Sequence, residues 1–559
     1  MPQNLAIVLF FFILFTRCDF HSLEKPVELE LYQKRVVQES LAKVHFQTQK
    51  ETPNTLSSKE KEIFLYEDAQ ARQSLALFPE TTFHKLEEIY ASTIAHSHKV
   101  KMYEQFPLIQ ETSIEEAKAA FDPVIFLEGQ YEHKDEPIGS TLKTGDMGRF
   151  EEDTGTWKIG VKNKAITGAQ VSLSQELKLL DNNSQFTTPN PQNQVKLAFT
   201  VSQPLLRGGG LEYNRSVVKI ALLDTQSSQQ EALKNIEDHL MEVTKIYWSL
   251  YLTRVHLVQE QKMVSRLEKI LLEMQNRSAM DVLPNQISRA RADLLEIQSS
   301  IIRTKGNVRN LQLQLQSLVN SPDFKKPGKE IIPMENLTLD RPSVDLNQSL
   351  TIALKNRSEV KKSFLEIWAY AIRENMAKHE IMPVLNLIAS VSIESLRENG
   401  NLRTFSEQFE AGKPSFSVGG TFEFPWGNRA ARAKLKKAIQ EKKRFMFQFQ
   451  EVVDRILLEV MAAHEDVENN YLQIQTDIQA GNTVEEELAF LDKRSFITEQ
   501  KFSIHNLESL GYFLEQLLNA NNRLLQAQKK IAQSIVYYHI SLAQLRRVTG
   551  TFLQYQKKW

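Results

Sequence analysis

Few residues in this chain have the types and spacing that chemistry would need. Gly208, Gly209 and Gly210 precede a helix-forming segment, and a glycine-rich turn before a helix can hold phosphate. The lysine and serine or threonine of a phosphate-binding loop are missing there. His96 and His98 are two residues apart in an expected helix, so they do not share a face and do not predict a metal site. No triad or pair of carboxylates stands out, and the sequence predicts no enzyme and no cofactor.

A basic run is the next candidate, and its residues are Lys434, Lys436, Lys437, Lys442, Lys443 and Arg444. No aromatic residues of the kind that stack on bases are interleaved with it, so it is typical of a solvated helix face. The whole chain has 68 basic and 69 acidic residues, a balance that does not favour a nucleic-acid partner. Glycine and proline are scarce, at 20 and 18 of 559 residues, as a mostly helical chain requires.

The three glycines lie where the sequence pattern changes. From Val195 to Ser202 apolar and polar residues alternate, which predicts a strand with one apolar face. From about Glu212 the apolar period becomes that of a helix, and it continues for some sixty residues. Pro204 ends the strand because it has no N–H to donate, and the glycines allow unusual backbone angles. The stretch is therefore a hinge between a strand and a very long helix.

The chain also repeats itself. Six residues recur 260 positions later without a gap: Leu86, Tyr90, Ile94, Val100, Ala117 and Pro123 match Leu346, Leu350, Leu354, Val360, Ala377 and Pro383. A second block recurs 217 positions later: Ile236, Val243, Leu250 and Leu257 match Val453, Val460, Val467 and Ile474. Such self-similarity predicts a tandem repeat, with copies at about 83–320 and 343–550 and a proline-containing linker at 321–342.

Each copy has the same order of elements: a helix ending at a proline, strands, a proline hinge and a long helical hairpin. We expect strands at 124–133 and 195–205 in the first copy and at 384–394 and 415–424 in the second. Each is about 10 residues long, the length of a tilted strand that crosses a bilayer, with one apolar and one polar face. This favours a membrane barrel; the other interpretation is a soluble antiparallel sheet half-covered by a core. The first copy has an extra candidate hairpin at 157–180, with Gly168 near its turn.

The long helices come in pairs, at 212–320 and 428–550. Their apolar residues recur at steps of three and four over many heptads, which indicates helices packed side by side as coiled coils. The first of these helices, expected from Glu212 to Gln275, has 64 residues. At about 1.5 Å per residue it is about 96 Å long, too long for a compact domain. Helices with one apolar seam and a polar back can line a tube when several copies close into a cylinder.

The amino terminus has an apolar run, LAIVLFFFILFT, from Leu5 to Thr16. It is shorter than the ~20 residues of a membrane-spanning helix and has the length of a signal-peptide core. We therefore expect residues 1–18 to be an export signal. Cys18, the single cysteine, stands where a bacterial lipoprotein is acylated; the alternative is that it leaves with the signal peptide. Residues 19–82 form an N-terminal extension outside the repeat, and 551–559 a tail.

Several motifs together resemble one known family. QPLLRGGG from Gln203, followed by Asn214-Arg215, is similar to the strand-to-helix signature of the TolC-type outer-membrane efflux proteins, and PWGNRA from Pro425 is similar to its second-copy counterpart. AFDP ending at Pro123 and EIMP ending at Pro383 match the proline that ends the preceding helix. The segment from Leu346 to Val360 matches the opening helix, and the segment from Ala520 to Ala532 the alanine-rich ascending helix.

The resemblance covers about 83–550 and implies a fold, an assembly and a function. The fold is mainly α with transmembrane β, and each subunit of a homotrimer gives four strands to one shared twelve-stranded barrel. The barrel sits in outer-membrane lipid, and the helices form a periplasmic tunnel. The protein is then a passive exit duct, as in type I secretion, that works with a periplasmic adaptor and an inner-membrane pump or ABC transporter. The residues at the hinges between strands and helices are Pro123, Pro204, Gly208, Gly209, Gly210, Pro383, Pro425 and Gly427.

The resemblance also implies that the hairpin tips close the tunnel and contact the adaptor. The expected tip residues are Met280, Asp281, Asn506, Leu507, Glu508 and Ser509. The family usually has glycine in these turns, and here Met280 and Asn506 take the glycine positions. Rings of Asp281 and Glu508 from three subunits would select cations, unless they are ordinary solvated turn residues.

Two other classes of protein compete with this interpretation. A periplasmic coiled-coil adaptor or scaffold with a soluble β domain would share the long helices, but it would not need bilayer-length strands with exposed apolar sides. A helical pore-forming toxin would need apolar helices of about 20 residues. The sequence has none outside the short run at its amino terminus.

Overall fold

The structure is a computed structural model that describes residues 27–43, 80–139, 144, 148–276, 284–326, 329–335, 337, 339, 345–398, 405, 408–409, 413–500 and 507–553. The chain divides into two compact units. One includes Pro107–Ser227 and Ser363–Gln448; the other includes Ser228–Lys362 and Phe449–Trp559.

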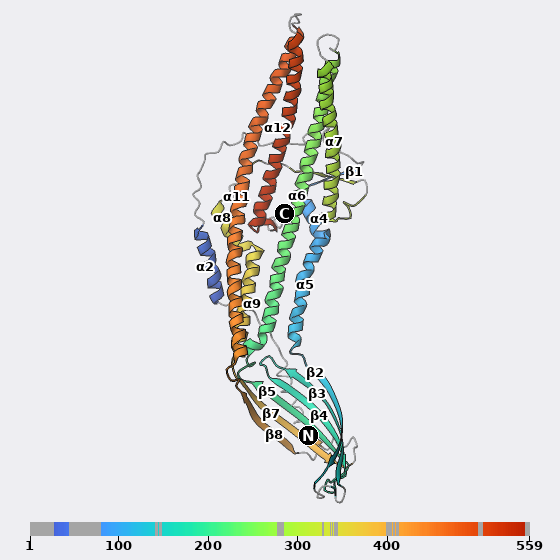
Figure 1. Ribbon diagram of the computed structural model, residues 1–559, viewed down its shortest axis with the longest axis vertical. Coiled ribbons are helices and arrows are strands. Elements are labelled where there is room, and N and C mark those ends of the chain that lie inside the picture. Colours follow the sequence, from blue (N-terminus) through green and yellow to red (C-terminus); the bar gives the residue numbers. More distant parts are fainter. Residues whose placement is uncertain are drawn as a thin grey trace. The chain divides into compact units, whose positions relative to one another are not determined.

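The first unit is built on an antiparallel sheet of six strands (Figure 1). In spatial order these are β2 (Val124–Pro137), β3 (Arg149–Lys164), β4 (Gln170–Asn182), β5 (Gln192–Pro204), β7 (Val384–Arg397) and β8 (Pro414–Glu423). Every strand is antiparallel to its neighbour, and β5 pairs with β7 although 179 residues separate them.

The resemblance implied four strands per chain in the barrel, but the four expected strands and the extra hairpin together form one sheet of six. The hairpin lies between the first and second expected strands: β3 pairs with β2 from Val124 to Pro137, and β4 pairs with β5. We call β3, β4 and their turn at 165–169 the inserted hairpin. Its first strand begins at Arg149 rather than Trp157, because the pairing continues past the alternating apolar residues into a segment with charges on both faces.

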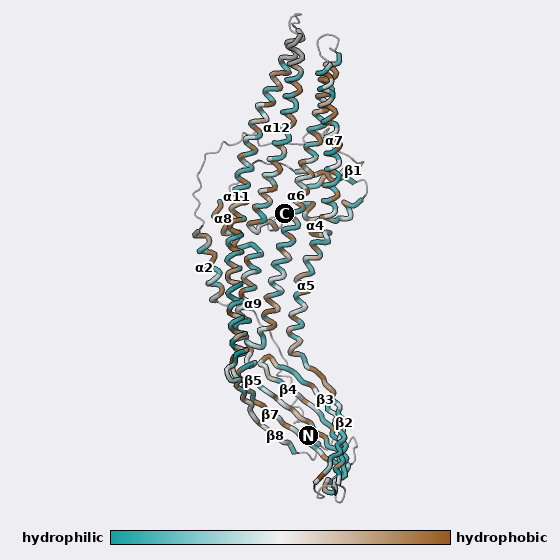
Figure 2. Tube along the Cα trace, in the orientation of Figure 1, coloured by the Kyte–Doolittle hydropathy of each residue, from teal (hydrophilic) through white to brown (hydrophobic). Residues whose placement is uncertain are grey.

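Long helices continue the chain at the ends of the strands. They are α5 (His98–Ala119), α6 (Leu211–Asn276), α9 (Ser358–Glu380) and α11 (Arg429–Gln500), and each runs from one unit into the other. With 66 residues, α6 is about 99 Å long. Figure 2 shows that apolar and polar residues alternate along these helices, as packing in pairs requires. None of the helices in the described ranges combines the length and apolar composition needed to cross a membrane.

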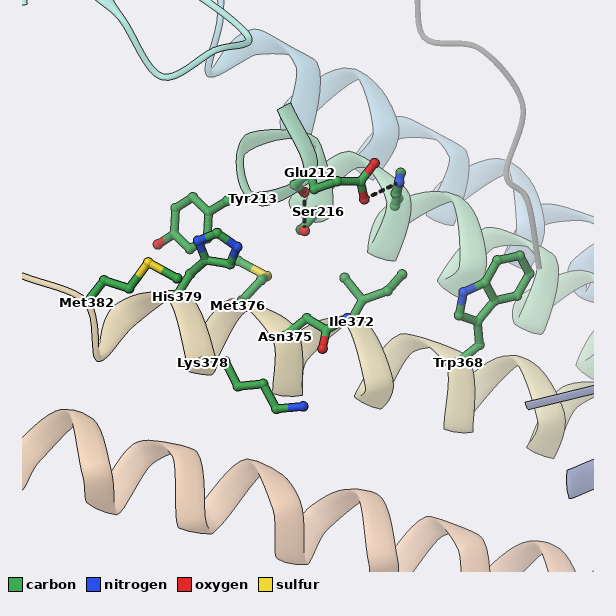
Figure 3. Close-up of a pocket in the computed structure, with 11 residues that line it drawn as sticks. Glu212, Tyr213, Ser216, Trp368, Ile372, Asn375, Met376, Lys378, His379 and Met382 are labelled. Atoms are coloured by element: carbon green, nitrogen blue, oxygen red, sulfur yellow. Dashed lines mark hydrogen bonds and ion pairs between the residues drawn. The ribbon is translucent and has the colours of Figure 1, made fainter. Parts of the chain in front are cut away.

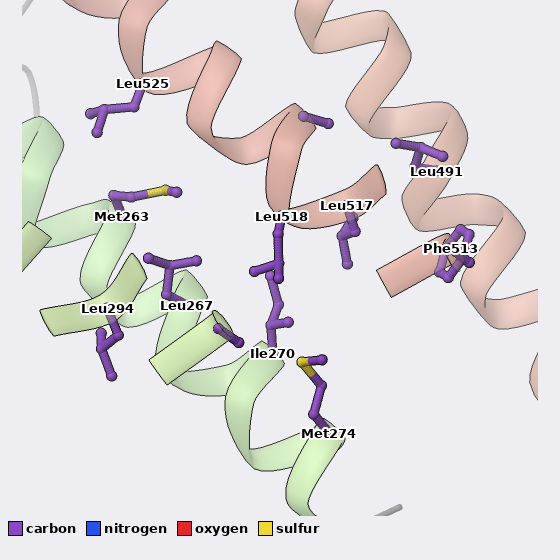
Figure 4. Packing of buried hydrophobic residues seen from close by; sticks show 12 residues of the cluster. Met263, Leu267, Ile270, Met274, Leu294, Leu491, Phe513, Leu517, Leu518 and Leu525 are labelled. Carbon is purple, nitrogen blue, oxygen red and sulfur yellow. The ribbon is translucent and has the colours of Figure 1, made fainter. Parts of the chain in front are cut away.

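The second unit contains the remaining helices, which are α4 (Leu86–His96), α7 (Pro284–Val319), α8 (Leu346–Asn356) and α12 (Leu507–Val548), and most of α2 (Val27–Lys43). One of its apolar clusters joins α6 and α7 to α11 and α12 (Figure 4). Met263, Leu267 and Ile270 from α6 face Leu518 and Leu525 from α12. These residues recur at steps of three and four, which places them on one face of each helix.

Two short strands in the second unit were not expected. β1 (Glu80–His84) lies parallel to β6 (Lys329–Pro333). The sequence placed most of β1 in the N-terminal extension and all of β6 in the linker, so these segments are structured parts of the fold. The linker is also bound to α6, because the Arg254 guanidinium donates to Glu330 Oε1 at 2.7 Å and to the Ile331 carbonyl at 3.0 Å.

Candidate functional site

The first hinge, residues 204–210, lies at the end of β5 and is hydrogen-bonded to the second half of the chain. The Leu205 N–H donates to the Leu385 carbonyl at 2.8 Å. The Arg207 N–H donates to the carbonyl of Pro383 at 3.2 Å. Two of the predicted hinge prolines, Pro204 and Pro383, are thus brought together where β5 and β7 meet the helices.

Each glycine of the first hinge has its own reason to be glycine. Gly208 and Gly210 have φ of +80° and +93°, angles that other residues rarely adopt. At Gly209 a Cβ atom would lie 2.4 Å from the Pro204 carbonyl oxygen. The Asn214 side chain fixes the turn, since its Nδ2 donates to the carbonyls of Gly208 and Gly210, both at 2.9 Å. The glycines serve geometry, and they hold the first turn of α6 against the strand.

The second hinge, residues 425–428, is shorter. Gly427 has a φ of +79° and Asn428 a φ of +38°, so the chain turns through two left-handed residues. The Asn428 side chain donates from Nδ2 to the Ile381 carbonyl at 2.9 Å, two residues before Pro383. Pro123 lies elsewhere, just before the edge strand β2, where α5 ends in a turn closed by the Asp122 N–H and the Ala119 carbonyl at 3.1 Å.

The turn of the inserted hairpin rests on the first hinge, a contact that sequence reasoning missed. The Gly210 N–H donates to the Thr167 carbonyl at 3.1 Å, and Thr167 Oγ1 donates to Gln203 Oε1 at 3.1 Å. Gly168 has a φ of +92°, and a Cβ atom there would lie 2.4 Å from the Gly208 carbonyl oxygen. The first hinge, which is longer and richer in glycine than the second, therefore provides the backbone against which the turn of the inserted hairpin packs.

One face of the sheet is apolar across all six strands. The paired residues of one row are Ile125, Val161, Leu173, Phe199, Val391 and Phe416. At the two edges Ile125 is 75% exposed and Phe416 is 82% exposed, without any cover from the described part of the chain. On β7 the apolar alternation runs from Leu385 to Ile393, nine residues, which matches a bilayer-spanning strand. We call this surface the apolar face.

The opposite, polar face has a row in which charges alternate. The row runs across five strands through Glu128, Lys158, Glu176, Lys196 and Glu394. Lys196 Nζ lies 2.6 Å from Glu394 Oε1. Acidic and basic side chains that face each other across strands attract one another, so the charges of the row compensate one another in large part. Such a face suits the wall of a water-filled passage.

A groove of about 380 Å³ lies between α6 and α9, close to the first hinge (Figure 3). Tyr213 and His379 face each other across it, with ring centroids 5.6 Å apart. Near them, Lys219 Nζ donates to Glu212 Oε2 at 2.9 Å, which engages both charges. The described residues contain no group of three or more histidine, cysteine, aspartate or glutamate side chains that could hold a metal ion. The groove is a seam between helices and shows no reactive constellation.

Several predicted site residues lie outside the described part of the chain. They are Cys18, Met280, Asp281 and Asn506. Leu507, Glu508 and Ser509 begin α12, but their side chains are not described. The tip and lipidation hypotheses therefore stay predictions.

Sequence reasoning also missed the buried ion pair of Arg254 and Glu330, whose side chains are both 0% exposed. A signal was present: Arg254 stands four residues after Leu250 and three before Leu257, on the apolar seam of the helix. A charge in such a position predicts a buried partner, although it does not say which one.

Comparison with known proteins identifies the fold of the chain. No family model and no curated protein matches the sequence. Among solved structures, the outer-membrane channel OprN is similar with a TM-score of 0.59 and 11% identity, over 91% of this chain and 99% of that one. CusC is similar with a TM-score of 0.60 and 12% identity, over 91% of this chain and 99% of that one. VceC from Vibrio cholerae is similar with a TM-score of 0.57 and 15% identity, over 84% of this chain and 96% of that one. Over nearly its whole length, the chain has the fold of the TolC-type outer-membrane channels.

Proposed function

We propose that this protein is the outer-membrane channel of a tripartite efflux or secretion system. It is a passive exit duct that spans the outer membrane and extends into the periplasm. The observation that carries this proposal is the sheet, whose apolar face is exposed at both edges while its polar face carries alternating charges. Hinges then lead from the sheet into helices of 66 and 72 residues. That combination joins a membrane wall to a long tube.

The fold supports the outer-membrane location, since OprN is named as an outer-membrane channel, VceC as an outer-membrane protein and CusC as a protein that forms a transmembrane channel. Residues 1–18 would direct export, and Cys18 would be a lipid anchor if the signal is of the lipoprotein type. The neighbours are channel proteins and not enzymes, and a passive duct needs no catalytic group. An adaptor or scaffold in the periplasm is disfavoured, because it would leave apolar residues such as Ile125 and Phe416 in water.

The chain would work as a homotrimer. A periplasmic adaptor would bind the helical tips around Met280–Asp281 and Asn506–Ser509, and an inner-membrane pump or ABC transporter would supply the energy. The proposed boundaries are repeat one at 83–320, the linker at 321–342 and repeat two at 343–550. Two helix breaks support the repeat: α4 gives way to α5 at Ser97, and α8 to α9 at Arg357, which is 260 positions later.

Fractionation followed by semi-native gel electrophoresis tests the proposal. We expect the protein to be found in outer membranes, to need detergent for extraction and to migrate as a trimer that heat converts to monomer. A soluble monomer obtained without detergent would overturn it. Deleting the gene and measuring export of candidate compounds then identifies the cargo.

A further inference from the structure

The six-stranded sheet has two open edges in the described part of the chain, β2 on one side and β8 on the other. All ten residues of β8 are exposed. An unpaired strand edge presents rows of free N–H and C=O groups, and hydrocarbon does not tolerate them. If the apolar face lies in a membrane, another strand must pair with each edge.

The inserted hairpin is an integral part of the sheet, paired on both sides. Two reciprocal pairs fix β3 against β2: the Phe126 ring lies over Gly160 on the polar face, and the Trp157 ring lies over Gly129 on the apolar face. A Cβ atom at Gly160 would be 2.7 Å from Phe126, and one at Gly129 would be 3.0 Å from Trp157. Both the apolar row and the charge row continue through β3 and β4 without interruption.

The register of the sheet has the stagger of a membrane barrel. The row that starts at Val124, one residue after Pro123, passes through Lys162, Ser172, Thr200 and Ser390 and ends at Ser417, eight residues before Pro425. If both prolines mark one membrane boundary, the row climbs about seven residues over five strand spacings. At ~3.3 Å per residue and ~4.8 Å per strand, the tilt is about 44°, within the range of transmembrane barrels.

We propose that β8 of one copy pairs with β2 of the next, and that three copies close a barrel of eighteen strands instead of twelve. The inference rests on the trimer of the proposed function. The strands alternate in direction and number six per copy, so β8 and the next β2 are antiparallel. The same stagger predicts the register between copies. It must shift by an even number of residues, because an odd shift would exchange the two faces. A shift of six or eight places Ser417 opposite Gln130 or Glu132 of the next copy.

Eighteen strands change the width of the passage at its outer end. A closed barrel with this tilt is about 25 Å across between backbones with twelve strands and about 38 Å with eighteen. The inserted hairpin adds no helix, because β3 and β4 are joined by the turn at 165–169. The proposed barrel is therefore wider than one of twelve strands, while the inserted hairpin leaves the number of helices per chain unchanged.

Electron cryomicroscopy of the detergent-extracted protein, viewed down the symmetry axis, tests the proposal. The matched control lacks residues 139–183, so that β2 leads directly into the loop before β5. Eighteen strands in the full chain and twelve in the deletion variant are expected, with a circumference ratio of three to two. A trimer with twelve strands in the full chain would overturn the inference and leave the proposed function standing. Dimers with twelve strands, or soluble monomers, would overturn both.

Cysteine cross-linking in native membranes tests the seam independently, even if the deletion variant does not fold. Ser417→Cys combined with Gln130→Cys or Glu132→Cys is expected to give covalent dimers and trimers on denaturing gels. Ser417→Cys with Tyr131→Cys is the control, because Tyr131 lies on the opposite face. Cross-links with Tyr131→Cys equal to those at both polar positions, or none at any position, would show that this seam does not exist.

Discussion

At the scale of single residues, the most consequential pair is Arg254 and Glu330, both fully buried, 2.7 Å apart. Removing one partner would leave an uncompensated charge in the interior. We expect Arg254→Ala to lower the free energy of unfolding by about 3–5 kcal/mol. Arg254→Met combined with Glu330→Leu should recover most of that loss, because it removes both charges. Guanidinium unfolding followed by circular dichroism in detergent measures each variant.

The control for that series is Arg523→Ala. Arg523 pairs with Glu487 at 2.6 Å, a similar distance, but its side chain is 57% exposed. A loss below about 1 kcal/mol is expected there. If Arg254→Ala cost no more than Arg523→Ala, the buried pair would not be holding the linker to α6.

Glu237 gives the second prediction at this scale. Burial, with the neighbouring Glu359 carboxylate, raises its pKa to about 7. The folded state thus keeps a proton that the unfolded chain loses from about pH 4.5, so this group's contribution to stability is lost as pH rises from about 4.5 to 7. Glu237→Gln should match the wild type at pH 4.5 and exceed its free energy of unfolding by about 3 kcal/mol at pH 8.

Unfolding of the wild type and Glu237→Gln between pH 4.5 and pH 8 checks this. Burial lowers the pKa of His539 to about 4. Both proteins keep that histidine, so its own pH dependence cancels in the difference between them. A difference that did not change with pH would contradict the raised pKa.

At the scale of elements, the contact between the turn of the inserted hairpin and the first hinge leads to a testable prediction. Gly168→Ala would force a side chain into a left-handed residue 2.4 Å from the Gly208 carbonyl oxygen. We expect a loss of about 2 kcal/mol or more and a lower melting temperature of the proposed trimer on semi-native gels. Gly139→Ala is the control, since nothing lies within 4 Å of its Cβ position. Equal melting of both variants would mean that the turn does not bear on the hinge.

The elements also show what sequence alone can reach. The change of period around Pro204 predicts a strand followed by a helix, and β5 indeed ends at Pro204 while α6 begins at Leu211. Alternation failed at residues 149–156, because that part of β3 has polar side chains on both faces and carries no period. It failed again for β1 and β6, since a parallel pairing over some 250 residues leaves no local pattern. The hinge glycines were predicted, but their contact with Thr167 and Gly168 was not, because it depends on the register of the whole sheet.

At the scale of the whole molecule, aromatic residues should mark the membrane boundary. Trp426 of the second hinge is 97% exposed, beside the apolar Phe424, as in the aromatic girdle of a barrel. In liposomes, lipids brominated near the headgroup should quench its fluorescence. Trp426→Phe should then lose a large share of the total quenching. Trp368→Phe is the control, because Trp368 is 4% exposed in α9. Equal losses in the two variants would place Trp426 away from the lipid.

The even number of strands has a consequence for how such ducts change over time. A single added strand would reverse the direction of one edge and make the contact between copies parallel, so the ring could not close as before. A hairpin is the smallest insertion that preserves closure, and the threefold symmetry of the proposed trimer would multiply it to six strands. If the chain forms the proposed trimer, its barrel can therefore widen only in steps of six strands, and one added hairpin per chain separates neighbouring sizes.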